Sequence, residues 1–253
     1  MCGDGRGAMC WSIPVKRLSD YPAWLSAGAM AIMSPMNQAL TQQRIRTTFG
    51  KFGALRFVGH LDLAKTWERV LRRAQVPLEY TQGFNPRPRM QLAAALPVGV
   101  TSESELLDIW LTERLGGQFP DAWIERLAAT SPEGLHIYSL VEVPIKDDAL
   151  PTQVTSAEYV IIPADPGLTP DDLAARVAAL LARPTIERAG RKKVYDLRPL
   201  ILDLSMDRDS RLIARMKTGE KANGRPDELL DALGLELWQA HIHRRRLYLG
   251  DEV

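Results

Sequence analysis

The part of the sequence that most constrains the fold is residues 55–111, with the phrase GFNPRPRM at residues 83–90 in its centre. Pro86 and Pro88 fix their own φ angles and push the residues that precede them towards extended geometry. A turn with so few conformations holds its side chains in place at a low entropic cost. This phrase therefore predicts a constrained turn, which either presents side chains to a partner or sets the register of the flanking strands.

An amphipathic helix is predicted before this turn, over residues 61–74, and Pro77 ends it. Apolar residues recur in it at helical spacing and form one face. Lysine and arginine residues recur on another face, where like charges repel one another unless something anionic is near. This second face is either an ordinary solvated surface or a surface that meets an anionic partner. The apolar face holds Leu63, Trp67, Val70, Leu71 and Ala74, and the cationic face holds Lys65, Arg69, Arg72 and Arg73.

Charge is distributed unevenly around the same stretch. Residues 44–92 contain ten Lys and Arg residues and three Asp and Glu residues, whereas acidic residues outnumber basic ones over residues 101–148. A basic region followed by an acidic one indicates an anionic partner on one side only. The alternative is that the two regions neutralise each other within the fold.

The order of the predicted elements is β-α-β-β-α-β, and this order occurs twice. Strands are predicted from alternation and helices from their longer period. We therefore expect an α+β fold made of two tandem ferredoxin-like domains with antiparallel sheets. The first copy comprises residues 44–49, 61–74, 89–96, 105–112, 119–129 and 135–143; the second, with an added hairpin at 185–188 and 192–197, comprises residues 157–163, 171–181, 201–206, 211–217, 226–233 and 241–249.

Changes in composition mark the expected domain boundaries. Residues 1–42 are rich in Gly, Ser, Pro, Ala and Met without a period, so we expect either a disordered extension or sequence upstream of the true start of translation. Residues 147–156 are polar and contain Pro151, which predicts a linker. The two expected ferredoxin-like domains are residues 43–146 and 157–253.

Several classes of function are excluded by what the sequence lacks. Both cysteines, Cys2 and Cys10, lie in the N-terminal extension, so residues 43–253 offer no thiolate for a disulfide or an iron–sulfur cluster. The chain has no P-loop, no dinucleotide-binding fingerprint and no nucleophile elbow. No apolar run reaches the roughly 18 residues that span a bilayer, and no signal peptide is evident. We expect a cytoplasmic protein with no membrane association and no bound cofactor, and an enzyme is not the leading expectation.

A family resemblance is carried by the motifs FVGHLDL at residues 57–63, RRA at 72–74, QGFNPRPR at 82–89, ALPVGVTSESELLDI at 95–109 and KKVYDLRP at 192–199. Together they resemble the radical-SAM-linked protein family, a bacterial domain of unknown function. Proteins of that family are fused to, or encoded beside, radical S-adenosylmethionine (SAM) proteins of the cobalamin-binding type. The resemblance implies such a protein as a partner, and an accessory role in a radical modification system that acts on RNA. One position departs from the pattern, because Gly59 stands where a serine is expected before His-Leu-Asp.

The leading hypothesis is an RNA-binding accessory protein that presents rRNA or tRNA for modification; DNA is not an expected partner. Lysine and arginine side chains would meet backbone phosphates and give affinity without sequence readout. Phe84, Tyr195 or Tyr248 would stack on unpaired bases. This hypothesis predicts one positive surface shared by both domains. Its candidate residues are Lys65, Arg69, Arg72, Arg73, Phe84, Asn85, Arg87, Arg89, Lys192, Lys193, Arg198, Arg244, Arg245 and Arg246.

Two other classes of function stay open. A stand-alone enzyme would use a pocket formed by His60, Asp62, Asn85 and Asp196, and it predicts a deep cavity with perturbed carboxylates. A protein adaptor that docks the radical SAM partner predicts an exposed apolar patch. For His60 and Asp62 there is also a purely structural interpretation, in which His60 caps the helix and Asp62 favours its dipole.

Further polar pairs give weaker signals. Glu105 and Asp108 are three apart in a predicted strand, so they should point to opposite faces and not form a paired-carboxylate site. Asp196 and Arg198 share a strand face, which favours a local ion pair or an extension of the binding surface. The two imidazoles of residues 241–243 also share a face, but without a third ligand we expect no metal site, and an anion-binding or charged edge strand is favoured.

Overall fold

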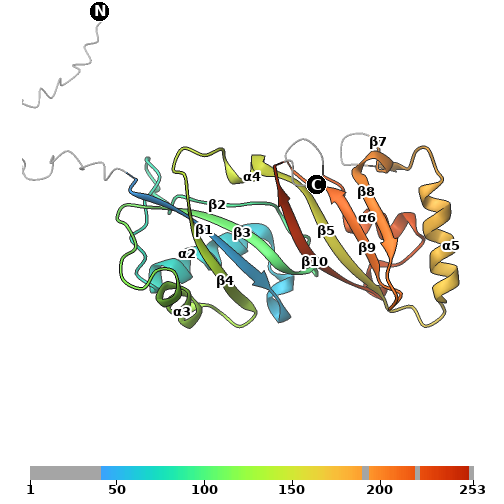
Figure 1. Ribbon diagram of the computed structural model, residues 1–253, viewed down its shortest axis with the longest axis horizontal. Helices are drawn as coiled ribbons and strands as arrows, with labels where there is room; N and C mark the ends of the chain where they lie inside the picture. The colour runs from blue at the N-terminus through green and yellow to red at the C-terminus, as the bar shows by residue number, and fades with distance from the viewer. Residues whose placement is uncertain (1–40, 190–193, 220–222, 251–253) are drawn as a thin grey trace, which may run out of the picture. The chain divides into compact units, whose positions relative to one another are not determined.

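The computed structural model describes residues 41–189, 194–219 and 223–250, and residues 40–253 cluster into one compact unit. The described residues form five α-helices and a mostly antiparallel eight-stranded sheet, so the fold is α+β as expected (Figure 1). Seven strands lie in the order β4-β1-β3-β10-β5-β9-β8, and β2 pairs with β3. None of the helices described is long and apolar enough to cross a membrane. The expected extension, residues 1–42, lies outside the described residues except for its last two positions.

Strands β1 to β4 form the first half of the sheet, in the order β4-β1-β3-β2 and with antiparallel pairs throughout. Helices α2 and α3 pack their apolar residues against one face of these strands and share a core with them. The bounds of the elements are β1 Gln43–Lys51, η2 (a 3-10 helix) Gly53–Phe57, α2 His60–Arg73, β2 Met90–Leu92, β3 Thr101–Leu111, α3 Asp121–Thr130 and β4 Leu135–Val143.

Helix α2 forms where the apolar period predicts a helix, and its bounds differ from the prediction by one residue at each end. Trp67 is completely buried, and its ring meets the ring of Phe49 edge-on, with 4.9 Å between centroids. The helix ends before Gln75, whose φ of 54° is left-handed, and Pro77 follows. Burial of one face thus fixes α2 on the sheet and leaves the opposite, cationic face exposed.

Strands β5, β8, β9 and β10 form the second half of the sheet, in the order β10-β5-β9-β8 and again with antiparallel pairs. The two halves share one strand order. In the first half β4 pairs with β1, and β3 lies between β1 and β2. In the second half β10 pairs with β5, and β9 lies between β5 and β8. The added hairpin, β6 and β7, forms a separate two-stranded sheet. The bounds are α4 Leu150–Gln153, β5 Val154–Pro163, α5 Pro170–Leu181, β6 Glu187–Ala189, β7 Val194–Asp196, η3 Arg198–Leu200, β8 Ile201–Met206, β9 Leu212–Lys217, α6 Pro226–Ala232, η4 Leu237–Gln239 and β10 Ala240–Leu249.

The two halves are joined by a parallel pairing of β10 with β3, in which His243 lies opposite Thr101 and Arg244 opposite Ser102. Apolar residues of the first half, including Leu96 and Val100, belong to the core of the second half. The expected linker, residues 147–156, instead holds α4 and the start of β5. The sheet is therefore continuous across both halves, and residues 40–253 form one compact unit.

One strand is much shorter than its sequence predicts. The strand expected over residues 89–96 is limited to β2, Met90–Leu92. Beyond it, Ala93 still donates its N–H to Leu106 O at 3.0 Å, and Leu96 turns into the core of the second half. The apolar run continues past the strand because these residues pack beneath the second half of the sheet.

Candidate nucleic-acid interface

The exposed face of α2 carries the four predicted cations Lys65, Arg69, Arg72 and Arg73. Lys65 pairs with Asp62 at 3.0 Å, but both side chains are largely exposed, so the pair is weak. In the part of the chain that the structure describes, neither Arg69 nor Arg73 has an ion-pair partner. The C-terminal turns of α2 therefore keep positive charge that the fold itself does not neutralise.

The stiff turn folds back beside this end of α2. Tyr80 forms an isolated bridge with Pro88, and Thr81 N–H donates to Arg87 O at 2.8 Å. The guanidinium of Arg72 lies over the ring of Tyr80, 5.8 Å from its centroid. This contact joins two segments that the sequence predicts separately.

Together these segments form what we call the basic–aromatic patch. Its aromatic members are accessible, since Tyr80 is 40% exposed and Phe84 is fully exposed. Gly83, at the tip of the turn, has a φ of 136°, which a residue with a side chain rarely adopts. The patch consists of Arg69, Arg72, Arg73, Tyr80, Phe84 and Arg87.

Arg89 and Asn85 flank the patch and differ in their surroundings. Arg89 donates to Glu79 Oε1 at 3.0 Å, and its guanidinium stacks over Trp110 at 4.7 Å. Arg89 thus fastens the base of the turn to β3, and its charge is partly neutralised. Asn85 lies in the exposed part of the turn.

The prediction that Arg244 belongs to the binding surface is wrong. Its side chain is completely buried, and its Nε donates to Glu105 Oε1 at 2.8 Å. Residues of β10 alternate between faces, and Arg244 falls on the same buried face as Ile242. The run of three arginines looks solvent-exposed in the sequence, but its first member is an interior residue.

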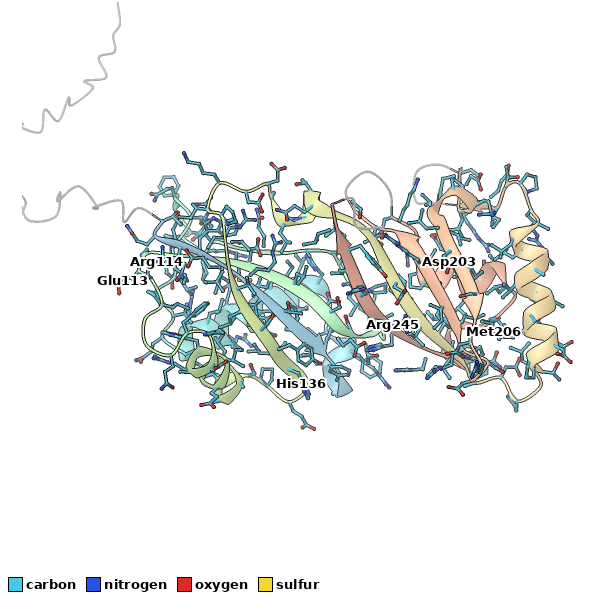
Figure 2. All side chains as sticks on the ribbon, in the orientation of Figure 1. Glu113, Arg114, His136, Asp203, Met206 and Arg245 are labelled. Carbon is cyan, nitrogen blue, oxygen red and sulfur yellow. The ribbon has the colours of Figure 1, made fainter. Side chains whose placement is uncertain are left out.

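The two following arginines lie away from α2. Arg245, labelled in Figure 2, donates to Glu158 Oε1 at 2.6 Å, and Arg246 lies over the ring of Tyr248. Glu158 sits between the buried residues of β5, so alternation turns it to the uncovered face of the sheet. The expected single positive surface shared by both halves is therefore not formed by these side chains.

The remaining predicted cations are Lys192, Lys193 and Arg198, and the structure describes only Arg198. Lys192 and Lys193 lie outside the described residues. Arg198 lies in the second half, where its Nη1 approaches Ile201 O at 3.5 Å. The expected ion pair with Asp196 is replaced by a backbone contact, because Arg198 N–H donates to Asp196 Oδ1 at 2.9 Å.

The four residues proposed for an enzyme pocket have separate roles where the structure describes their contacts. Asp196 accepts N–H bonds from Ile186 and Arg198, which fixes the turn after β7. Asp62 pairs with Lys65 on the surface of α2. His60 is the first residue of α2 and not its cap, since Gly59 holds that position without a side-chain bond. Among the described residues, no hydrogen bond or ion pair joins these three residues to Asn85 or to one another.

A buried cluster of charges lies between the halves, and sequence analysis did not recognise it. Lys51 is 1% exposed, and its Nζ donates to Val58 O at 2.7 Å. Burial lowers the pKa of Lys51, while the nearby Glu105 carboxylate acts in the opposite direction. Burial likewise lowers the pKa of His60. The Glu105 carboxylate raises this pKa, whereas the charges of Arg244 and Lys51 lower it further. The spacing of these residues in the sequence gives no sign that they meet.

A second buried cluster neutralises part of the basic region. Arg44 and Arg46 of β1 both bind Asp108 of β3, at 2.6 and 2.8 Å. Glu105 and Asp108 therefore serve different partners, as their three-residue spacing predicts. Charge compensation within the fold holds for these β1 arginines and does not extend to the patch on α2.

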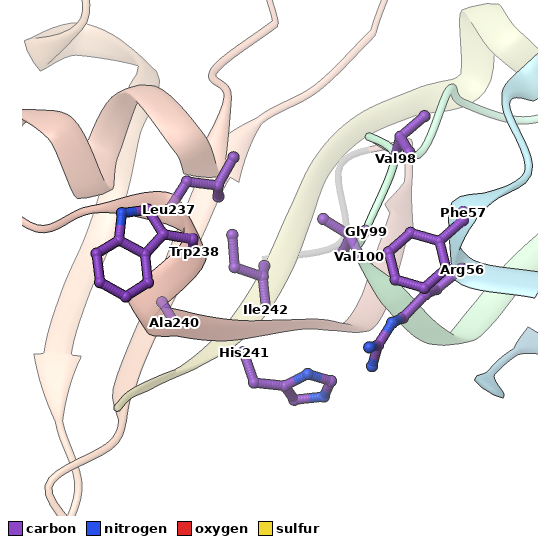
Figure 3. A pocket seen from close by; sticks show the side chains of 10 residues that line it. All are labelled: Arg56, Phe57, Val98, Gly99, Val100, Leu237, Trp238, Ala240, His241 and Ile242. Atoms are coloured by element: carbon purple, nitrogen blue, oxygen red, sulfur yellow. The ribbon is translucent and has the colours of Figure 1, made fainter. Parts of the chain in front are cut away.

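A groove lies where η2 and the loop before β3 approach η4 and β10, and it has a volume of about 490 Å³ (Figure 3). Trp238 and Phe57 are among its lining residues and are 79% and 60% exposed. Sequence analysis did not single out either ring. Trp238 lies outside any apolar period, and such an aromatic residue indicates an exposed ring. The lining comprises Arg56, Phe57, Val98, Gly99, Val100, Leu237, Trp238, Ala240, His241 and Ile242.

Comparison with known proteins gives a family and no activity. A family described as uncharacterized proteins conserved in bacteria (DUF2344) matches residues 44–226. This match begins in β1 and ends at the start of α6, so it covers most of the described fold. No curated protein matches the sequence. The chain belongs to the DUF2344 family of uncharacterized bacterial proteins.

Proposed function

We propose that this protein is an RNA-binding accessory protein that presents rRNA or tRNA to a cobalamin-type radical SAM protein. The observation that carries the RNA-binding part is the contact of Arg72 with Tyr80, which places the cations of α2 beside the turn that holds Arg87 and Phe84. Unpaired cations attract backbone phosphates, and exposed rings stack on unpaired bases. A surface with both properties suits a single-stranded segment of RNA.

The rest of the proposal is supported by the chain's other properties. Residues 41–253 contain no cysteine, so a cluster that drives radical chemistry would belong to a partner. The motifs resembling the radical-SAM-linked family, such as residues 82–89, include the turn that forms the patch. The shared strand order of the two halves supports treating them as tandem ferredoxin-like units.

Binding of a labelled single-stranded RNA, followed by fluorescence anisotropy over a series of salt concentrations, tests the proposal. For single strands the slope of log affinity against log salt is about −0.7 per neutralised phosphate. The double substitution Arg72→Glu and Arg87→Glu should weaken binding at every salt concentration and make the slope shallower by about 1.4, for the two lost contacts. The matched control is Arg183→Glu with Arg208→Glu, which changes the net charge equally at exposed sites in the second half.

The two variants separate a local site from a general charge effect. Equal binding by the patch variant and the control variant would contradict the proposal, as would a lack of binding by the unmodified protein at low salt. Phe84→Ala should weaken binding by about 1–3 kcal/mol if a base stacks on this ring, and Phe84→Tyr should preserve most of the affinity.

A further inference from the structure

We propose that the groove between the two halves of the sheet binds one nucleotide, with its base against Trp238 and its phosphate towards Arg56 and His241. This site is separate from the basic–aromatic patch, and the inference goes beyond the proposed function. The same chemistry is offered by a free mononucleotide and by the terminal nucleotide of an RNA chain.

The ring of Trp238 is the natural surface for a base. It is 79% exposed, and the described residues place no other ring or cation over it. Leu237 and Ile242 are apolar lining residues of the same groove and are labelled with Trp238 in Figure 3. Leaving a large flat ring in water is unfavourable, and stacking on a base removes that surface from water.

Arg56 supplies a positive charge at the other end of the groove. Its ionisable lining residues are Arg56 and His241, and no carboxylate is among the residues that line it. The guanidinium of Arg56 lies over the ring of Phe57, 4.7 Å from the centroid, so Phe57 positions this charge at the rim. The imidazole of His241 is placed by Thr101, whose Oγ1 lies 3.3 Å from Nε2. An apolar wall facing a positive rim complements a ligand with a flat base and an anionic phosphate.

Backbone contacts fix both walls in place. Gly99 N–H donates to Arg56 O at 2.9 Å, and Lys51 Nζ donates to the same oxygen at 3.3 Å. On the opposite wall, Ala164 N–H donates to Gln239 O at 2.6 Å, which anchors the end of η4. The volume of about 490 Å³ lies within the range of small-ligand pockets. The groove is thus preformed, which favours binding of a small ligand.

Isothermal titration calorimetry of the full chain with AMP, adenosine and ribose 5-phosphate tests the assignment. AMP should bind, adenosine should bind more weakly, and ribose 5-phosphate should bind least, because it lacks the base. Trp238→Ala should weaken AMP binding about tenfold or more. Arg56→Gln should weaken AMP binding and leave adenosine binding unchanged. Tyr138→Ala, which removes an exposed ring on β4, is the matched control and should bind AMP like the unmodified protein.

A second arm distinguishes the two sources of the nucleotide. If a short oligoribonucleotide with a 5′-phosphate competes with AMP, and Trp238→Ala weakens both, the groove accepts the end of a chain. If only AMP binds there, the groove accepts a free nucleotide. Equal affinities of Trp238→Ala and the unmodified protein for every ligand would overturn the inference. It would also be overturned if Trp238→Ala lost binding to a protein partner and kept its affinity for every nucleotide. The Arg72→Glu, Arg87→Glu variant should retain AMP binding, so failure of the patch and failure of the groove are distinguishable.

Discussion

Individual arginines in this protein have very different roles, which depend on the face of the strand or helix that carries them. Arg244 forms a buried ion pair with Glu105, and Arg44 forms one with Asp108. Arg73 of α2, by contrast, is exposed to solvent. A buried ion pair depends on both partners, because removal of one leaves a charge in the interior. The sequence cannot distinguish these cases in a run such as residues 244–246, since one step along a strand moves a side chain to the other face.

Substitution of Glu105 by Gln should destabilise the protein by about 3–5 kcal/mol, because Arg244 would keep a buried charge without its carboxylate. The matched control is Glu158→Gln, whose partner Arg245 is 48% exposed, and it should cost at most about 1 kcal/mol. Urea unfolding followed by circular dichroism gives both values. Equal losses of unfolding free energy in the two variants would show that the buried Arg244–Glu105 pair contributes no more to stability than the exposed Arg245–Glu158 pair.

His60 should make stability depend on pH in one direction. Burial lowers the pKa of His60 in the folded protein below 6.5, its ordinary value, so the unfolded chain binds protons more readily. The stability gained by keeping His60 neutral is therefore complete above pH 6.5 and is lost as the pH falls towards the lowered pKa.

Unfolding free energies of the unmodified protein and of His60→Gln, measured from pH 7 down to pH 5, test this sign. The advantage of the unmodified protein should shrink as the pH falls. His136→Gln, at an exposed position of β4, is the control for the loss of an imidazole elsewhere in the fold. An advantage at His60 that grows on acidification would contradict the assignment.

At the scale of elements, α2 shows what a strong local pattern can predict. Leu63, Trp67, Val70 and Leu71 are all buried, as their spacing indicates, and the cations on the opposite face are exposed. The helix is predictable because its apolar period and its ending before Pro77 are both local features of the sequence, contained in a stretch of about four turns. Strand β2 is less predictable, because one apolar run first forms the strand and then enters the core of the second half.

Trp67 should anchor α2 through its volume and not through its indole N–H. This N–H is buried and has no hydrogen-bond partner in the described part of the chain. Trp67→Ala should cost about 3–5 kcal/mol, as expected for a large core side chain. Trp67→Phe removes the unpaired polar atom and should cost less than about half as much. Thermal and urea unfolding of both variants measure the ratio, and equal losses would show that Phe cannot fill the site.

At the scale of the whole molecule, the order of elements was predictable and the joining of the halves was not. The sequence predicts both sets of strands, but the pairing of Thr101 with His243 connects positions far apart in the chain. No feature of the sequence near either residue predicts this pairing. The same limit applies to function: the basic face of α2 and the Arg87 turn were predictable, whereas the groove at Trp238 and the cluster around Lys51 require the assembled sheet.

The location of RNA on the folded protein is the most direct test of the proposed function. Ultraviolet cross-linking to a single-stranded RNA, followed by mass spectrometry of the cross-linked peptides, reports which residues the RNA touches. We expect cross-links at Tyr80 or Phe84, and their loss in the Arg72→Glu, Arg87→Glu variant. Cross-links that avoid residues 80–87, or that persist unchanged in this variant, would contradict the assignment of the basic–aromatic patch as the RNA-binding surface.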